Sequence, residues 1–350
     1  MVVKVPGLGL VARVVLWLAL AVSLILGGCA GGGGNHPAAV HQVVAVVPGR
    51  PQPTVAATVP GPVHYRDRVV VLMFHNLGSD PQGDTVAPAT FAADLAALRT
   101  GGFSAVSAAQ FAAFLNGRGT VPPNAYLLTF DDGYEGVYQY AYPLLLQYRD
   151  PALLFPVAGW VGQRPDRLTW PQLRIMLGSG LVAVGSHTYD SHGALPVSPV
   201  ATVPATVATA YSPLTGRTET VAQAQARMFG DLSLAEAAIR AHLGVLTPYF
   251  AYPFGAYDQP LIQVLHRVGY RDLFSTLGGA NAPGENPDVI FRINVGTPRV
   301  TPAGLVEAVS GTGRGPVYRA PSFWCQPWCA KALAGELGGT AAGVKAGTLK

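Results

Sequence analysis

Residues 125–133 read AYLLTFDDG, an apolar run that ends in two adjacent carboxylates and a glycine. The apolar run predicts a buried strand over Ala125–Phe130, and the glycine predicts a turn directly after it. Two adjacent acids at the end of a core strand are unfavourable, because like charges in a partly dry site raise each other's pKa. A bound cation is the usual compensation for that repulsion. We therefore interpret Asp131 and Asp132 as part of a metal site.

A second polar segment, residues 186–192, reads SHTYDSH and supplies two imidazoles, His187 and His192. One carboxylate and two histidines leave coordination positions open for water, which is typical of a catalytic rather than a structural metal site. The other carboxylate is then free to act as a base. Taken singly, Asp-Asp-Gly could be a simple turn and the histidine pair a surface loop. Their joint position after predicted strands favours a site.

Strand and helix patterns alternate from residue 69 onward. Short apolar runs predict strands at Val69–Phe74, Ala125–Phe130, Ala152–Val157, Leu181–Gly185 and Pro248–Tyr252, with short ones near Phe274 and Ile290. Helices are expected over Phe91–Leu98, after Ser107, over Gly136–Gln147, after Thr169, in a long region that Ser233-Leu-Ala-Glu236 would cap at its end, and over Gln259–Val268. Repeated βα units predict an α/β fold with a parallel sheet, closed into a barrel or open and doubly wound.

The residues with reactive side chains fall just after these strands: His75, Asp131, Asp132, His187, His192 and the Pro253-Phe254-Gly255 turn. Such clustering at the carboxyl ends of strands favours a barrel with its site on that face. Residues 193–218, rich in Pro, Thr and Val, would form a loop over the site.

The chain begins with features of an export signal, residues 1–29. A thin positive region is followed by the apolar run Val14–Leu26 and by Leu-Gly-Gly-Cys29, which resembles a bacterial lipoprotein cleavage box in which Cys29 is acylated. An uncleaved anchor or a plain secretory signal would equally predict export. Residues 30–66 are rich in Gly, Pro and Val and predict a flexible tether to a catalytic domain over 67–312, followed by a tail over 313–350.

Composition excludes some functions. The chain of 350 residues is 49% hydrophobic and 12% charged, with a net charge of +4 and no Lys/Arg cluster, so nucleic acid is not an expected partner. The three cysteines do not suggest a catalytic thiol. In an exported chain Cys325 and Cys329 would form a local disulfide more readily than a metal site. We expect a monomer outside the cytoplasm, anchored by lipid to the bacterial cell membrane.

Three motifs follow one another along the chain: Thr-Phe-Asp-Asp-Gly at 129–133, Ser-His-Thr-x-x-x-His at 186–192, and Ala-Tyr-Pro-Phe-Gly at 251–255. Over about residues 67–300 the chain resembles the polysaccharide deacetylase family, the NodB-homology domains of carbohydrate esterase family 4. The segments Leu72–His75, Leu168–Trp170 and Phe291–Val295 add to the likeness. The resemblance implies a distorted (β/α) barrel, in agreement with the strand-end argument.

The resemblance also implies residue roles. Asp132, His187 and His192 would hold a divalent metal ion, commonly Zn²⁺, with Co²⁺ or Ni²⁺ as alternatives. Asp131 would be the general base that takes a proton from the attacking water. The backbone N–H of Phe254 would help to hold the oxyanion. Residues expected to contact the substrate or oxyanion are Tyr189, Tyr252, Pro253 and Phe254.

The sequence departs from the family pattern at three places, and two of these are missing residues. Many members carry an arginine two positions before the motif proline, where this chain has Ala251. Arg292 is our candidate to orient the base instead, with a plain surface salt bridge as the alternative. Many members use a late histidine as general acid, but none follows His266 here. His75 is the candidate acid, with a structural hydrogen-bonding role as its rival.

The two histidines are five positions apart, whereas many members of the family space them four apart. A spacing of five resembles deacetylases of biofilm poly-β-1,6-N-acetylglucosamine, which we therefore favour as the substrate. Peptidoglycan N-acetylglucosamine follows, and chitin-like oligomers or acetylxylan rank lower. A catalytically silent carbohydrate-binding lipoprotein on the same fold is the alternative from a different class.

Overall fold

The computed structural model describes residues 61–316 and residue 324, and every structural statement below concerns that part of the chain. The predicted signal peptide with Cys29, most of the predicted tether, and Cys325 and Cys329 lie outside the described residues. Among the described residues, no helix combines the length and apolar character needed to cross a bilayer.

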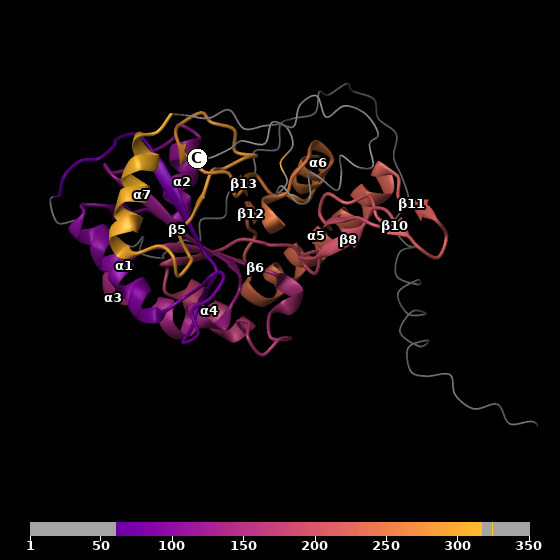
Figure 1. The fold of residues 1–350 in the computed structure, drawn as a ribbon, viewed down its shortest axis with the longest axis horizontal. Helices are drawn as coiled ribbons and strands as arrows, with labels where there is room; N and C mark the ends of the chain where they lie inside the picture. The colour runs from indigo at the N-terminus through magenta and orange to yellow at the C-terminus, as the bar shows by residue number, and fades with distance from the viewer. Residues whose placement is uncertain (1–60, 317–323, 325–350) are drawn as a thin grey trace, which may run out of the picture. The chain divides into compact units, whose positions relative to one another are not determined.

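A parallel sheet forms the centre of the fold (Figure 1). Its main strands run in the order β1 (Val69–Phe74), β5 (Ala125–Asp132), β6 (Ala152–Pro156) and β7 (Val182–Val184), each parallel to its neighbour. Three two-residue strands extend it: β4 (Ser104–Ala105) beside β5, β15 (Ile293–Asn294) parallel to β1, and β14 (Ala280–Asn281) antiparallel to β1.

A second parallel pair, β12 (Tyr249–Ala251) and β13 (Asp272–Phe274), continues the sheet around a curve. Single bridges join it at both sides, Ser186 with Phe250 after β7 and Phe274 with Ile290 ahead of β15. Because β15 pairs with β1, the strands close into a ring. Two junctions of this ring, those at Ser186–Phe250 and Phe274–Ile290, are made by a single bridge each. The predicted distorted (β/α) barrel is therefore confirmed.

Both faces of the main strands are buried, as their continuous apolar sequences predict. Side chains alternate along a strand, so Val69, Leu127 and Phe155 point into the barrel with Phe274. Their neighbours Val70, Leu128 and Leu154 pack outward against the helices. In β5 the inward row continues through Thr129 to Asp131, which places that carboxylate at the end of the barrel interior.

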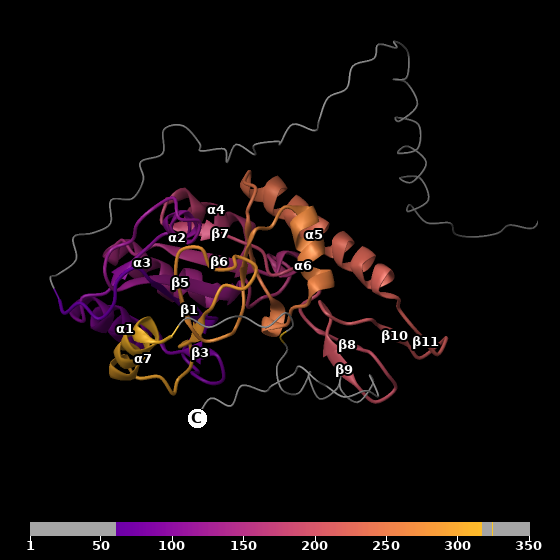
Figure 2. The same cartoon turned by 90° about the horizontal axis from the view of Figure 1, so that it is seen from above.

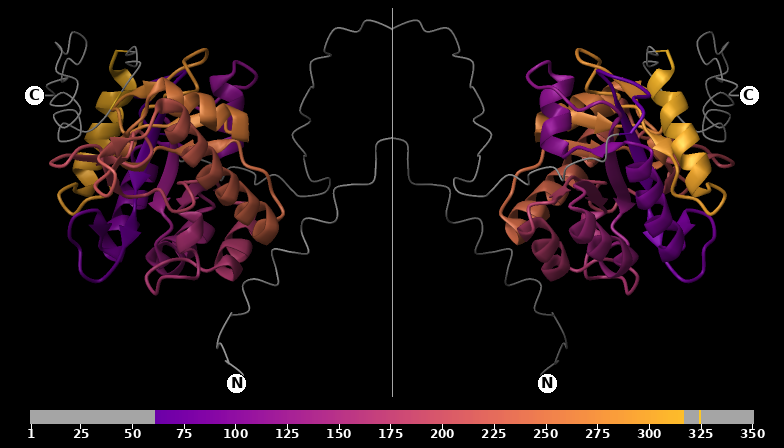
Figure 3. Two further views of the ribbon diagram at one scale, coloured as in Figure 1. Left: turned by 90° about the vertical axis from the view of Figure 1, so that its right-hand side faces the viewer. Right: turned by 90° about the vertical axis from the view of Figure 1, so that its left-hand side faces the viewer.

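Most helices cover the outer face of the sheet, whereas the helix Ala108–Leu115 packs against the inward-facing side chains through Phe111, Phe114 and Leu115. The yellow α7 (Pro302–Arg314) lies beside α1 (Pro88–Thr100) in Figures 1 and 3, so the last described helix packs against the first. Figure 2 shows α5 and α6 together on the other side of the fold. The helices not yet bounded are α2 (Ala108–Leu115), α3 (Tyr142–Tyr148), α4 (Trp170–Gly178), α5 (Val221–Leu243) and α6 (Gln259–Val268).

Capping boxes start three of these helices. Ser107 and Thr169 accept hydrogen bonds from the backbone of Gln110 and Gln172, as the sequence predicts. The third box, Thr220 with Gln223, begins α5. Our placement of a cap at Ser233–Glu236 is wrong, because α5 runs through these residues without interruption and ends at Gly244 in a left-handed conformation.

The remaining segments differ from expectation in detail. The helix expected over 136–147 begins as a π-helical turn, η2 (Val137–Ala141), before α3. Residues 193–218 are not one loop, since they form two small antiparallel pairs. The short strands are β2 (Asn76–Leu77) with β3 (Thr85–Val86), β8 (Ala194–Pro196) with β9 (Thr202–Pro204), and β10 (Tyr211–Ser212) with β11 (Arg217–Thr218).

The fold extends past both predicted domain boundaries. Tyr65, assigned to the tether, is buried and donates its hydroxyl hydrogen to the carbonyl of Ala125. The backbone N–H of His64 donates to Oδ1 of Asn124. At the other end, α7 continues to Arg314, two residues beyond the predicted boundary at 312.

Candidate active site

Three segments meet at the carboxyl ends of the barrel strands. The first is the end of β5 with Asp131 and Asp132, the second follows β7 and carries His187 and His192, and the third is the 3₁₀ turn η4 (Pro253–Gly255) after β12. Parallel strands bring their carboxyl ends to one edge, so residues more than 120 positions apart become neighbours. All of these segments lie in the part of the chain that the structure describes.

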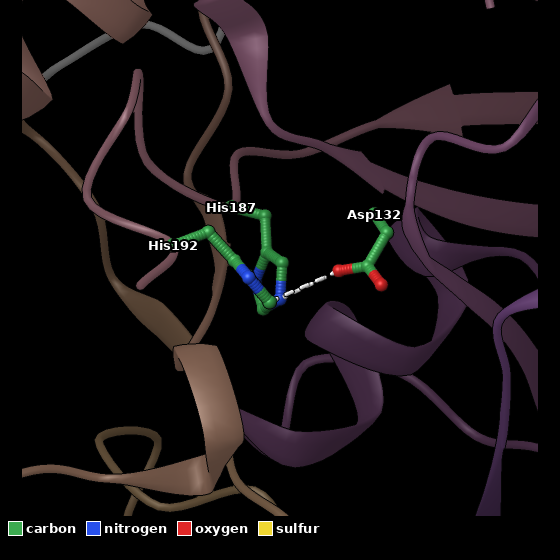
Figure 4. Close-up of side chains that lie close together, drawn as sticks. All are labelled: Asp132, His187 and His192. Carbon is green, nitrogen blue, oxygen red and sulfur yellow. Dashed lines mark ion pairs between the residues drawn. The ribbon is translucent and has the colours of Figure 1, made fainter. Parts of the chain in front are cut away.

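Asp132, His187 and His192 converge on one point (Figure 4). Oδ1 of Asp132 lies 3.4 Å from Nε2 of His187 and 3.1 Å from Nε2 of His192. Two atoms that each lie about 2.0–2.1 Å from a zinc ion at a tetrahedral angle are about 3.4 Å apart. Both separations from Asp132 thus fit a small divalent cation, and the three ligand atoms lie within 4.8 Å of one another.

The state of the ligand atoms agrees with such an ion. Oδ1 of Asp132 is buried and accepts no well-formed hydrogen bond from the described residues. Burial alone would raise the pKa of Asp132, but the imidazoles of His192 and His187 outweigh burial and hold the pKa well below its usual range. A buried, ionised and unsatisfied oxygen is unfavourable unless a cation completes its contacts. The donor set therefore fits a metal ion.

A backbone hydrogen bond orients His187. Its Nδ1 donates to the carbonyl of Ala251 in β12 over 2.7 Å, which leaves the Nε2 lone pair free to bind a metal. Burial lowers the pKa of the His187 imidazole to about 4, despite the opposing influence of Asp131. The ring is therefore neutral at pH 7, as metal binding requires.

Arg292 pairs with Asp131 across the barrel interior. Nη1 donates to Oδ1 over 2.7 Å and Nη2 to Oδ2 over 2.8 Å, a bidentate arrangement. Nε donates to the carbonyl of Ser275 over 2.8 Å, which fixes the guanidinium plane. Arg292 is 0% exposed, so the alternative of a surface salt bridge is wrong.

The pair sets the charge of the acid. Burial alone would raise the pKa of Asp131, but the Arg292 guanidinium, with help from His187, holds that pKa below its usual range. Asp131 is therefore ionised at neutral pH and contributes no ligand atom to the group of Asp132, His187 and His192. Two adjacent carboxylates thus have separate partners, one an arginine and the other the two imidazoles.

The candidate substrate residues divide into two groups. Phe254 is 37% exposed, and its ring centroid lies 4.7 Å from that of His192, so it borders the proposed metal site. Tyr189 is half-buried in the segment between the two histidines. Tyr252 is fully buried and donates its hydroxyl hydrogen to the carbonyl of Asp288, so its side chain cannot stack on a sugar. Pro253 is also buried.

The error at Tyr252 follows from strand alternation. Its neighbour Ala251 belongs to the barrel interior, so the next side chain points outward into the packing against α5 and α6. The turn still brings its backbone to the site. Phe254 has φ 57°, a left-handed value unusual for a non-glycine residue.

His75 lies directly after β1 and is partly buried. The parallel register of Phe74 with Phe130 brings the next residues, His75 and Asp131, to neighbouring positions, and the electrostatic influence of His75 lowers the pKa of both Asp131 and Asp132. Nδ1 is buried with no hydrogen-bond partner among the described residues, so the structure gives no support for a structural hydrogen bond through that atom.

Sequence reasoning did not identify Tyr134, Arg164 and Arg167, which group with Trp160 next to the metal ligands. Trp160 lies edge-on to His192, with ring centroids 5.3 Å apart. The guanidinium of Arg164 lies 3.6 Å from the Trp160 ring centroid, and that of Arg167 lies 3.7 Å from the Tyr134 ring centroid. Tyr134 follows the Asp-Asp-Gly motif directly, and this adjacency was the available signal.

Comparison with known proteins agrees with this geometry. Residues 118–273 match the family model described as polysaccharide deacetylase. This range includes the two acids, both histidines and the η4 turn, and excludes His75 and Arg292.

Among curated proteins, the chain is 30% identical over 242 residues to the poly-beta-1,6-N-acetyl-D-glucosamine N-deacetylase of Escherichia coli (strain K12), covering 64% of this chain and 36% of that protein. The Staphylococcus aureus (strain MRSA252) protein of the same name is 25% identical over 180 residues, 50% of this chain and 56% of that protein. The chain therefore spans only about a third to a half of these relatives.

Solved structures show the same fold. The BpsB deacetylase domain from Bordetella bronchiseptica superposes with a TM-score of 0.59 and 29% identity, covering 65% of this chain and 95% of that chain. IcaB from Ammonifex degensii superposes with a TM-score of 0.59 and 28% identity, covering 70% of this chain and 98% of that chain.

Proposed function

Because the chain belongs to the polysaccharide deacetylase family, we propose that it hydrolyses N-acetyl groups of N-acetylglucosamine residues in an extracellular polysaccharide, with a divalent metal ion as cofactor. The observation that carries the proposal is the separation of roles between two adjacent acids. Asp132 faces two imidazoles at 3.1 and 3.4 Å, while Asp131 is held ionised by Arg292. An ionised carboxylate that lies beside a metal site without binding the metal can act as the base in hydrolysis, whereas a protein that only binds carbohydrate does not need such a group.

The residues would divide the work as follows. Asp132, His187 and His192 would hold the ion, with Zn²⁺ favoured by the mixed nitrogen and oxygen ligands and Co²⁺ or Ni²⁺ as alternatives. Such an ion supplies Lewis-acid polarisation of the acetyl carbonyl and lowers the pKa of water from 15.7 toward about 7. Asp131 would accept the proton of the attacking water, oriented by the guanidinium of Arg292.

Two further groups complete the proposed mechanism. The backbone N–H of Phe254, in the left-handed η4 turn, would donate to the oxyanion that develops on the acetyl group. His75, beside both acids, would protonate the leaving amine, so that the products are acetate and a glucosamine residue. Tyr189 and the exposed ring of Phe254 would contact the sugar.

We favour poly-β-1,6-N-acetylglucosamine as the polymer. The support is the name of the curated relatives at 25–30% identity and the five-residue separation of the histidines. Peptidoglycan N-acetylglucosamine is the second candidate, and chitin-like oligomers and acetylxylan follow. The protein would act outside the cytoplasm as a monomer, held to the membrane by a lipid on Cys29. A Cys29→Ala chain that still partitions with membranes would refute that anchor.

The test is acetate release by purified protein from each polymer, after chelation and re-addition of zinc, cobalt or nickel. Asp131→Asn removes the base and leaves the three ligand residues in place, so we expect zinc to remain bound and acetate release to fall by about 10²–10⁴-fold. His187→Ala should lose both zinc and activity.

A protein that releases no acetate from any of the polymers, with or without metal, would instead be a carbohydrate-binding lipoprotein. Ala251 was one argument for that alternative, because the arginine that orients the base is missing there. Arg292 supplies an arginine to the base from another segment and removes that argument.

A further inference from the structure

The segment His187–His192 carries two of the three proposed metal ligands and has an unusual backbone. Thr188 has φ 77°, in the left-handed region that a β-branched residue rarely adopts. Such a conformation persists only where the surroundings impose it. The segment therefore depends on contacts with other parts of the fold to keep both imidazoles aimed at one point.

Asp231, in the middle of α5, supplies one of these contacts. Its Oδ1 accepts from the backbone N–H of Tyr189 and its Oδ2 from the backbone N–H of Asp190, each over 2.9 Å. Both oxygens of one carboxylate thus bind two successive amides next to the strained Thr188. Asp231 is separated by more than 35 residues from the segment and belongs to none of the three motifs.

A second support of the segment is η3 (Ala158–Trp160). The backbone N–H of Gly159 donates to the carbonyl of Tyr189 over 2.8 Å, and Nε1 of Trp160 donates to Oδ1 of Asp190 over 2.9 Å. The Trp160 ring in turn lies against His192. The segment is therefore held by two supports, and of these only Asp231 of α5 binds the backbone through a charged group.

We infer that Asp231 is a positioning residue that sets the affinity of the metal site by fixing the backbone between His187 and His192. The inference rests on the proposed function, since it assumes that these histidines bind a metal ion. Without the carboxylate, the two amides lose their acceptors and the turn at Thr188 relaxes toward an ordinary conformation. The imidazoles then adopt the metal-binding arrangement only part of the time, and the apparent affinity falls by the same fraction.

The experiment compares zinc affinity, by competition with a chelator, in the wild type, Asp231→Ala and Asp231→Asn. Loss of an outer contact of a metal site typically weakens binding by about 10–100-fold, and we expect a loss in this range for Asp231→Ala. Asp231→Asn keeps one acceptor oxygen and should lie between the two. At saturating zinc the rate of acetate release should return to the wild-type value, because the bound ion restores the arrangement.

A positioning role of Asp231 can be distinguished from a general loss of structure in the variants. Alanine favours helix, so a weaker affinity in Asp231→Ala does not come from unwinding of α5. Glu307→Ala removes an exposed carboxylate from α7 and should leave zinc affinity unchanged. If Asp231→Ala does not fold, Asp231→Asn, which has nearly the same shape, carries the test.

The inference would be overturned if the Asp231 variants bound zinc with wild-type affinity. This holds also if these variants released acetate more slowly at saturating zinc, because the defect would then not lie in metal binding. If the Asp231 variants bind zinc more weakly than the wild type, as expected, but the wild type releases no acetate, only the proposed function would be refuted. A wild type that binds no zinc would refute both.

Discussion

Arg292→Met is the most informative single substitution, because it leaves Asp131 buried without its partner. Methionine has a similar length but cannot donate the two hydrogen bonds to Asp131 or the one to the carbonyl of Ser275. Removing one member of a buried ion pair typically costs about 3–5 kcal/mol. Folded domains are stable by about 5–15 kcal/mol, so a folded population of the variant should remain, with a much lower free energy of unfolding.

The measurement is urea unfolding of the metal-free protein at pH 7.5, followed by circular dichroism. Arg292→Lys keeps the charge but loses the planar fork, so we expect a smaller loss of about 1–3 kcal/mol. The double variant Asp131→Asn/Arg292→Met removes both charges, and it should lose less than the sum of the single losses by about 1–3 kcal/mol. Arg299→Met changes an exposed arginine of the same segment and should stay within about 0.5 kcal/mol of wild type.

Activity should fall further than stability alone would predict. The guanidinium fixes the position of the proposed base, and a displacement of about 1 Å can cost roughly 10²-fold in rate. We therefore expect kcat of folded Arg292→Lys protein to fall by about 10²-fold, with KM little changed. Additive stability losses in the double variant, or a normal kcat in Arg292→Lys, would refute the assignment of Arg292 as the residue that orients Asp131.

Three further predictions follow from single contacts. His75→Ala should lower kcat by about 10²–10⁴-fold if His75 is the general acid, and a near-normal kcat would remove that role. Gly159→Ala would place a methyl carbon 2.6 Å from the carbonyl oxygen of Tyr189, so zinc affinity measured by chelator competition should fall. Unchanged affinity would contradict close packing of the segment His187–His192 against η3. Burial raises the pKa of Asp94 to about 7, above its unfolded value near 4, so the free energy of unfolding should fall as pH rises from about 4 to 7. Asp94→Asn should weaken that pH dependence in urea unfolding at several pH values, whereas exposed Glu307→Gln should not, and an unchanged slope in Asp94→Asn would be the contrary result.

The sequence predicts features whose cause is local. A continuous apolar run makes a strand that is buried on both faces, and Ser107 or Thr169 followed three positions later by glutamine begins a helix wherever the chain goes next. The pair Asp131 and Asp132 and the two histidines were identified for the same reason, since their positions after strands follow from neighbouring residues, whereas the choice of Asp132 as the metal ligand came from the resemblance to the family. The structure then adds the distances that bring them together.

Features that depend on distant contacts were harder to predict. Arg292 meets Asp131 from 161 positions away, so the sequence nominated it only through a motif and left a surface position open. Asp231 lies in a helix where nothing nearby distinguishes it from a solvated acid. Tyr252 was misassigned because a motif indicates which backbone is near the site but not which face a side chain takes. Ser233 shows the limit of a four-residue cap pattern, which cannot tell a helix end from a helix interior.

The barrel is joined between β7 and β12 by one bridge, Ser186 with Phe250, and the imidazole of His187 spans the same junction to reach the carbonyl of Ala251. One of the two single-bridge junctions of the barrel is thus the one that a bound ion would reinforce, because the ion would connect His187 to Asp132 at the end of β5. Loss of the ion should then weaken this junction, and the backbone amides of Ser186 and Ala251 would exchange hydrogen for deuterium sooner than those within β5.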